Sequence, residues 1–202
     1  FQENRAYSGS AIYTYADPLV ISGTLFLSNT IVSGNGGGIF SHYKARIINS
    51  FFQNNSGRAI YSENAVEIIN SDFIKNSGGS GSGALVKNGG VKVSDSSFIQ
   101  TTASDSGGVL YVSGNASAII TNTLFMTTTG GTGGTIFASG ALTMTDSHIE
   151  NSKGTGPGGA IFAIGTATLI NTDIISSTAA EGGGAIFGPV NVTGGRFERN
   201  KA

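Results

Sequence analysis

Short stretches in which apolar residues alternate with variable ones recur along the whole chain. Leu19-Val20-Ile21 is the first and Val66-Glu67-Ile68 a later example. Such a period of two is typical of a β-strand with one buried face. Both flanking positions are apolar in all eight stretches, which pair Leu19 with Ile21, Ala45 with Ile47, Val66 with Ile68, Val91 with Val93, Ala118 with Ile120, Leu142 with Met144, Ala167 with Leu169 and Val190 with Val192. The sequence therefore predicts eight equivalent strands.

A glycine-rich phrase precedes each stretch, and a phenylalanine-led phrase follows it. The first phrase approximates Gly-Gly-Ala-Ile-aromatic and centres on Ile12, Ile39, Ile60, Leu85, Leu110, Ile136, Ile161 and Ile186. The second approximates Phe-x-x-Asn and starts at Phe1, Phe26, Phe52, Phe73, Phe98, Phe125, Ile149, Ile174 and Phe197. The pair recurs about every 25 residues, a period that indicates a solenoid whose coils bury their faces against neighbouring coils.

Each coil is expected to hold three short strands: the glycine-rich phrase, the alternating stretch and the Phe-x-x-Asn phrase. Strands of the same sense that stack coil on coil form parallel sheets, and such crossovers are overwhelmingly right-handed. The predicted fold is an all-β, right-handed parallel β-helix of about eight coils, with residues 1–202 as one domain. Because the chain opens with Phe1 to Asn4 and closes with Phe197 to Asn200 in the same register, we expect it to be an uncapped segment of a longer β-helix.

The position three residues before each aligned phenylalanine carries an asparagine or aspartate in six coils. Identical asparagines in stacked coils lie about 4.8 Å apart and hydrogen-bond along the stack. We therefore predict a structural ladder of Asn49, Asn70, Asp95, Asn122, Asp146 and Asn171. A metal site is not expected there, since the sequence places no further carboxylate at this corner.

The composition of the chain narrows the classes of partner that it can bind, and it leaves the predicted fold unchanged. The chain carries a formal net charge of -1, so it has no basic surface for nucleic acid or anionic lipid. It contains no cysteine, which rules out disulfides and cysteine-ligated zinc. No apolar run approaches the roughly 18 residues that a transmembrane helix needs. No cofactor is expected, and an export signal or anchor would have to lie outside this chain.

The two phrases together resemble the repeat of the polymorphic outer membrane protein family, best known from surface passenger domains of chlamydial autotransporters. The resemblance is strongest at Gly158 to Ile161, at Gly183 to Ile186 and in the phrases that start at Phe52, Phe73 and Phe197. It implies an extracellular or cell-surface β-helix that acts in adhesion or surface assembly. Thr101, Thr128, Ser152 and Ser177 depart from the pattern by replacing the last asparagine.

One column of aromatic residues follows the glycine-rich phrases. Its members are Tyr13, Phe40, Tyr61, Tyr111, Phe137, Phe162 and Phe187, with Val86 as the one aliphatic member. If the preceding aliphatic residue points inward, the rings point outward as a stripe suited to docking a protein or sugar rings. The alternative is that the rings point inward and belong to the core. The sequence favours the outward orientation by a narrow margin.

Candidate catalytic groups are few. His148 and Asp173 occupy the same column of successive coils, which we interpret as a surface ion pair. His42 is expected to be a solvated turn residue, and Arg46, Glu67 and Lys92 to form an exposed charge ladder. The short links between strands leave no walls for a catalytic cleft, so the chain is not expected to be an enzyme.

The preferred function is a non-enzymatic adhesin or assembly rod whose partners are surface proteins, glycans or copies of itself. A shaft that only holds a functional tip is nearly as consistent with the sequence. The alternative from another class is a polysaccharide lyase-like or hydrolase-like β-helix with its catalytic coil outside this segment. Asn54, Asn115 and Asn191 match the N-glycosylation pattern, which matters only if the protein is a secreted eukaryotic one.

Overall fold

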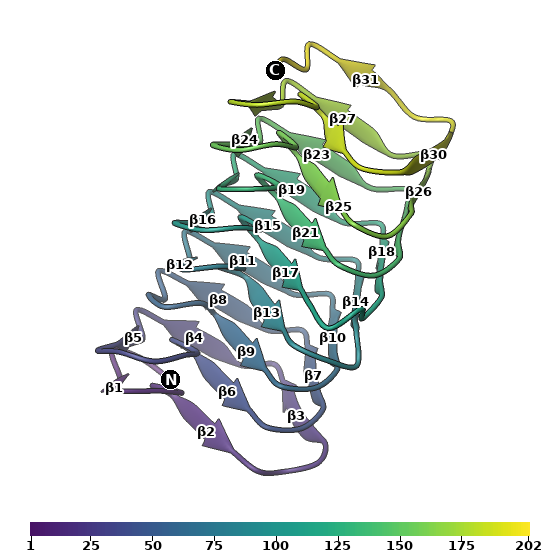
Figure 1. The fold of residues 1–202 in the computed structure, drawn as a ribbon. Helices are drawn as coiled ribbons and strands as arrows, with labels where there is room; N and C mark the ends of the chain where they lie inside the picture. The colour runs from purple at the N-terminus through teal and green to yellow at the C-terminus, as the bar shows by residue number, and fades with distance from the viewer.

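The computed structural model describes residues 1–202 and contains strands and turns without any helix. The chain winds into a stack of eight coils, so that equivalent strands from successive coils lie side by side (Figure 1). All strand pairs are parallel, and every coil contributes to three long sheets. The parallel β-solenoid predicted from the repeat is therefore confirmed.

The three long sheets correspond to the three repeated phrases. The aromatic sheet comprises β2 (Ile12–Thr14), β6 (Ile39–Ser41), β9 (Ile60–Ser62), β13 (Ala84–Val86), β17 (Leu110–Val112), β21 (Ile136–Ala138), β25 (Ile161–Ala163) and β29 (Ile186–Phe187). The alternating sheet comprises β3 (Leu19–Ser22), β7 (Ala45–Ile48), β10 (Val66–Ile69), β14 (Val91–Ser94), β18 (Ala118–Thr121), β22 (Leu142–Thr145), β26 (Ala167–Ile170) and β30 (Val190–Thr193). The phenylalanine sheet comprises β4 (Leu25–Leu27), β8 (Phe51–Gln53), β11 (Asp72–Ile74), β15 (Ser97–Ile99), β19 (Leu124–Met126), β23 (His148–Glu150), β27 (Asp173–Ile175) and β31 (Phe197–Glu198).

A ladder of two-residue strands, which the repeat did not predict, follows the phenylalanine sheet. It comprises β12 (Ser77–Gly78), β16 (Thr102–Ala103), β20 (Thr129–Gly130), β24 (Lys153–Gly154) and β28 (Thr178–Ala179), while β1 (Arg5–Ala6) pairs with β5 (Thr30–Ile31). Adjacent coils approach each other so closely beside this ladder that glycine is required, because a Cβ on Gly108 would overlap the carbonyl oxygens of Gly134 and Thr129.

The core runs along the inside of the coils and contains a column of stacked phenylalanines. Phe26, Phe52, Phe73, Phe98 and Phe125 are fully buried. Their ring centroids lie 4.5 to 5.2 Å apart, with interplanar angles of 2 to 15°. The spacing follows from the distance between parallel strands, which sets the separation of equivalent side chains. Ile149 and Ile174 continue the column, as the repeat predicts.

The register of one coil differs from the expectation. Ala84, not Leu85, pairs with Ile60 and Leu110, and Leu85 pairs with Tyr61 and Tyr111. Leu85, and not Val86, therefore occupies the aliphatic position in the aromatic column, and the glycine-rich phrase of this coil centres on Ala84. The backbone explains the difference, since Gly81 and Gly107 both adopt φ of +62° three residues before the aligned position.

Candidate binding face

The side chains of the aromatic column lie on the outer side of the aromatic sheet. Ile136 and Ile161 belong to the continuous core, whereas Phe137 and Phe162 do not. In β17, β21 and β25 the ring residue is less buried than the residues on either side of it. The outward orientation is therefore present. We call this surface the aromatic face, formed by Tyr13, Phe40, Tyr61, Leu85, Tyr111, Phe137, Phe162 and Phe187.

Leu85 divides the rings of the aromatic face into two stacks. In the first, Phe40 lies 4.8 Å from Tyr13 and 4.7 Å from Tyr61, measured between ring centroids. In the second, successive centroids from Tyr111 to Phe187 lie 4.7, 5.3 and 5.4 Å apart. Interplanar angles across both stacks range from 3 to 19°. Every ring thus lies nearly parallel to its neighbours.

This stacking decides which part of each ring meets the solvent. A ring inside a stack has both faces covered by its neighbours, so only its edge is directed outward. Sugar rings pack on the open face of an aromatic side chain, and the interior of these stacks offers none. Each stack therefore presents a row of ring edges, which carry the positive end of the ring quadrupole.

Polar side chains cover the first stack. Phe40 and Tyr61 are only 6% and 3% exposed. The His42 ring stacks on Tyr15 at 4.2 Å and meets Phe40 edge-on at 4.8 Å. The ammonium of Lys87 lies 5.5 Å from the centre of the Tyr61 ring. Phe40 and Tyr61 are therefore largely withdrawn from solvent, whereas Tyr13 at the end of this stack is 48% exposed.

His42 is not the solvated turn residue expected from the sequence. Its Nδ1 lies 2.7 Å from Glu63 Oε2, and its Nε2 lies 2.8 Å from the hydroxyl of Tyr13. The neighbouring Tyr15 hydroxyl, with desolvation, raises the pKa of Tyr13 above its ordinary value. The missed signal is the placement of His42 three residues after Ile39, level with Tyr15 and Glu63 in the adjacent coils.

The second stack lacks such a cover. Tyr111, Phe137 and Phe162 are partly exposed, and Phe187 is 45% exposed. No ion pair or cation–π contact involves these rings. Apart from Tyr13 in the first coil, the open part of the aromatic face is thus in the C-terminal half.

The predicted Asn ladder is present only as separate pairs. Asn70 donates to Asn49, Asn122 to Asp95 and Asn171 to Asp146, at 2.8, 2.8 and 3.2 Å. Each donor is an amide that reaches to the preceding coil, and an aspartate has no N–H with which to continue the chain of bonds. All six residues adopt positive φ between 45 and 52°, so they also form the turn.

A second asparagine column, which sequence reasoning overlooked, is fully buried. It uses the last residue of Phe-x-x-Asn: Asn29 Nδ2 donates to Asn55 Oδ1 and Asn55 Nδ2 to Asn76 Oδ1, both at 2.9 Å. The signal was the invariable spacing of these asparagines from the buried phenylalanines. This column forms an interior amide ladder in the N-terminal half.

The charged residues form ordinary surface contacts. Asp173 accepts a 2.7 Å bond from Arg196 and lies 3.7 Å from His148 Nδ1, and the Arg196 hydrogen bond lowers the pKa of Asp173. Arg46 pairs with Glu67 at 2.7 Å. Lys92 follows Glu67 in the column but forms no ion pair, so the predicted charge ladder is reduced to one pair.

One expectation about the carboxylates is wrong. Asp72 lines the same shallow hollow as Asp95 and Asp146, so the corner does hold a further carboxylate. No three His, Asp or Glu side chains converge as metal ligands do. Asn54, Asn115 and Asn191, which match the glycosylation pattern, are exposed.

Comparison with protein-family models, with curated proteins and with solved structures finds no match to this chain. The structure also has no helix with the length and apolarity that a membrane crossing requires.

Proposed function

We propose that this chain is a non-enzymatic rod of an extracellular or cell-surface protein and that its aromatic face docks another protein surface. The single observation that carries the proposal is the open second stack, whose rings offer edges to solvent from Tyr111 to Phe187. Contiguous exposed apolar surface of this kind marks interaction sites in soluble proteins.

The geometry favours a protein partner over a glycan on this face. Ring edges pack well against the aliphatic and aromatic side chains of a protein, whereas stacking of a sugar needs an open ring face. Aromatic residues are also the side chains most enriched at the centre of protein interfaces. Surface assembly, with copies of the same chain or with other components, is thus preferred to glycan adhesion through these rings.

The repeat supplies the second line of support. The links between β25 and β26 and between β21 and β22 are only three residues long, so no long insertion borders the aromatic face there, which suits an extended docking surface. The extracellular or cell-surface placement rests on the resemblance of the glycine-rich and Phe-x-x-Asn phrases to surface passenger repeats.

Site-specific photo-crosslinking of the protein in its native setting tests the proposal. A photoreactive phenylalanine analogue at Phe162 is expected to form a crosslink to a defined protein chain. The same analogue at Leu25, which is 48% exposed on the phenylalanine sheet, is the matched control and is expected to form none. Equal crosslinking from both positions, or none from Phe162, would overturn the proposal.

A further inference from the structure

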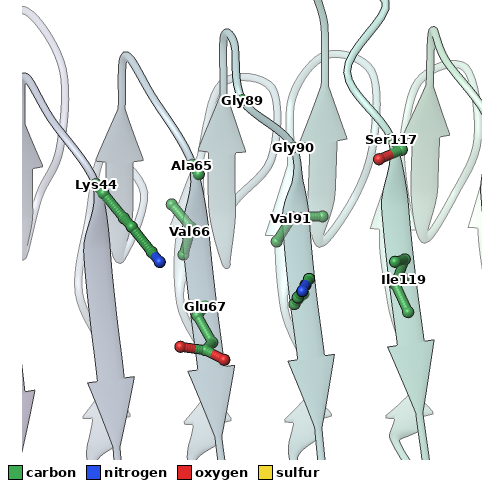
Figure 2. Close-up of a pocket in the computed structure, with 10 residues that line it drawn as sticks. Lys44, Ala65, Val66, Glu67, Gly89, Gly90, Val91, Ser117 and Ile119 are labelled. Atoms are coloured by element: carbon green, nitrogen blue, oxygen red, sulfur yellow. The ribbon is translucent and has the colours of Figure 1, made fainter.

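A shallow hollow lies on the outer side of the alternating sheet, away from the aromatic face. It crosses β10, β14 and β18 near the points where these strands begin (Figure 2). Its volume is about 230 Å³. Pockets for drug-sized ligands usually measure about 300 to 1,000 Å³, so this hollow suits a single small unit.

Two adjacent glycines create the hollow. Figure 2 shows Gly89 and Gly90 between the strands that carry Ala65 and Ser117. Gly90 adopts φ of +81°, and a Cβ on it would lie 2.6 Å from the carbonyl oxygen of Ser117. The backbone conformation and the close approach both require glycine. Because Ala65 is also small, the outer surface stays recessed between longer neighbours.

The charges around the hollow are unbalanced. Lys44 and Lys92 both line it and take part in no ion pair. Glu67 also lines it, but its carboxylate is held by Arg46 at 2.7 Å. Two lysine ammonium groups are therefore available to an incoming anion, and the one carboxylate present is already paired with Arg46.

Uncharged donors and an apolar wall complete the lining. The peptide N–H groups of Gly89 and Gly90 donate to no carbonyl oxygen of the chain. Ser117 adds a hydroxyl, and Ile119 on β18 presents a side chain that is 43% exposed. The hollow thus combines cations, hydrogen-bonding groups and one aliphatic surface.

We propose that this hollow binds one uronic acid unit of an acidic polysaccharide. The ammonium groups of Lys44 and Lys92 bind the sugar carboxylate, Ser117 and the glycine N–H groups bind hydroxyls, and Ile119 contacts the C–H bonds of the ring. An acidic peptide side chain has a carboxylate but neither the ring nor the hydroxyls that the rest of the lining suits. This inference does not rest on the proposed docking function, which uses another sheet.

Backbone amide NMR of the isotope-labelled chain provides the test, with an oligogalacturonate as the probe. Saturable shifts are expected at the amides of Gly89, Gly90 and Ser117, and added salt should weaken them. The fully methyl-esterified oligosaccharide has the same rings without the charge and is expected to cause no such shifts. An oligoglutamate of similar charge is expected to bind more weakly.

Two kinds of variant sharpen the result. The double variant Lys44→Gln/Lys92→Gln is expected to bind the oligogalacturonate about tenfold more weakly, which corresponds to about 1.4 kcal/mol. Lys153→Gln/Lys201→Gln, at two exposed lysines that do not line the hollow, is the charge-matched control and should leave binding unchanged. In Ala65→Leu the larger side chain fills the hollow, at a position whose backbone conformation accepts any residue, so binding is expected to weaken. The same spectra show whether this variant is folded.

Several outcomes would overturn the inference. Equal binding of the methyl ester would show that the carboxylate is not recognised. Tighter binding of oligoglutamate would identify an acidic peptide as the better ligand. Undiminished binding by a folded Ala65→Leu variant, or shifts confined to other coils, would place the oligosaccharide elsewhere.

Discussion

The last position of the Phe-x-x-Asn phrase, which we call the inner corner, differs between the two halves of the molecule. It holds a buried asparagine in coils of the N-terminal half and threonine or serine in most coils of the C-terminal half. Asn55 bonds to both neighbouring coils, because its Oδ1 accepts from the backbone N–H and the side chain of Asn29 while its Nδ2 donates to Asn76. Thr128 and Ser152 are joined by a single hydroxyl–hydroxyl bond of 3.1 Å, and their other side-chain bonds go to Thr135 and to the Gly159 carbonyl. Thr101 Oγ1 is buried without a partner. A primary amide carries its donor and its acceptor on separate atoms. It can therefore hydrogen-bond to the coils on both sides and at the same time accept a hydrogen bond from a buried backbone N–H.

The same two halves differ on the aromatic face. In the first, His42 and Lys87 cover Phe40 and Tyr61, and Glu63 holds His42 in place. In the second, the rings from Tyr111 to Phe187 have no such cover. The comparison shows that one repeated position can serve as interior in some coils and as surface in others, depending on the residues that follow it.

The largest difference between the halves is expected at the inner corner. Asn55→Ala leaves the buried backbone and side-chain donors of Asn29 without their acceptor, and we expect a loss of about 4 kcal/mol in the free energy of unfolding. Thr101→Val at the equivalent position removes an unpaired buried hydroxyl and keeps the shape, so it should raise stability by about 1 kcal/mol. Urea denaturation followed by circular dichroism measures both, and changes of the same sign would contradict the comparison.

A smaller difference is expected on the aromatic face. Tyr61→Ser removes a nearly buried ring and should destabilise the fold by about 3 kcal/mol. Phe162→Ser removes a partly exposed ring and should cost less than half as much. Thermal unfolding of the two variants tests this order. If Phe162→Ser proved the more damaging, the second stack would have to be structural core and not docking surface.

The smallest effect is expected at Asp173, a partly exposed ion-pair site of the C-terminal half. The hydrogen bond from Arg196 lowers the pKa of Asp173 below its ordinary value of 3.8. A lowered pKa in the folded state adds stability that is fully present above the unfolded-state pKa and is lost as pH falls through the folded-state value. Asp173→Asn should therefore lower the unfolding temperature slightly at pH 7 and have no effect in strong acid. A difference that persists in acid would mean that the side chain acts through packing.

Much of the fold could be predicted because each coil repeats the same constraints. The period placed Phe26, Phe52 and Phe73 in one buried column, and the structure confirms it. The register of Ala84 and Leu85 was misread because Ala-Leu-Val resembles the Ala-Ile-aromatic phrase. Only the backbone turn at Gly81, aligned with Gly107, settles which residue faces the core.

The candidate sites were less predictable than the core. Which asparagine column is buried depends on where the turn lies relative to the coil interior. The cover on the first aromatic stack depends on His42, Tyr15 and Glu63, which come from three different coils. The hollow near Gly90 arises because small residues from adjacent coils coincide. None of these arrangements follows from a single repeat.

The sequence by itself determined the solenoid, its coil number, its three long sheets and the identity of the core columns, because these follow from a period of about 25 residues and from alternation within it. The tertiary structure alone decided the edge-outward stacking of the aromatic rings, their division at Leu85, the buried amide ladder and the lysine-flanked hollow. The physical reason is that side chains far apart in the sequence become neighbours at the strand spacing of about 4.8 Å, and their contacts then depend on the particular residue in each adjacent coil.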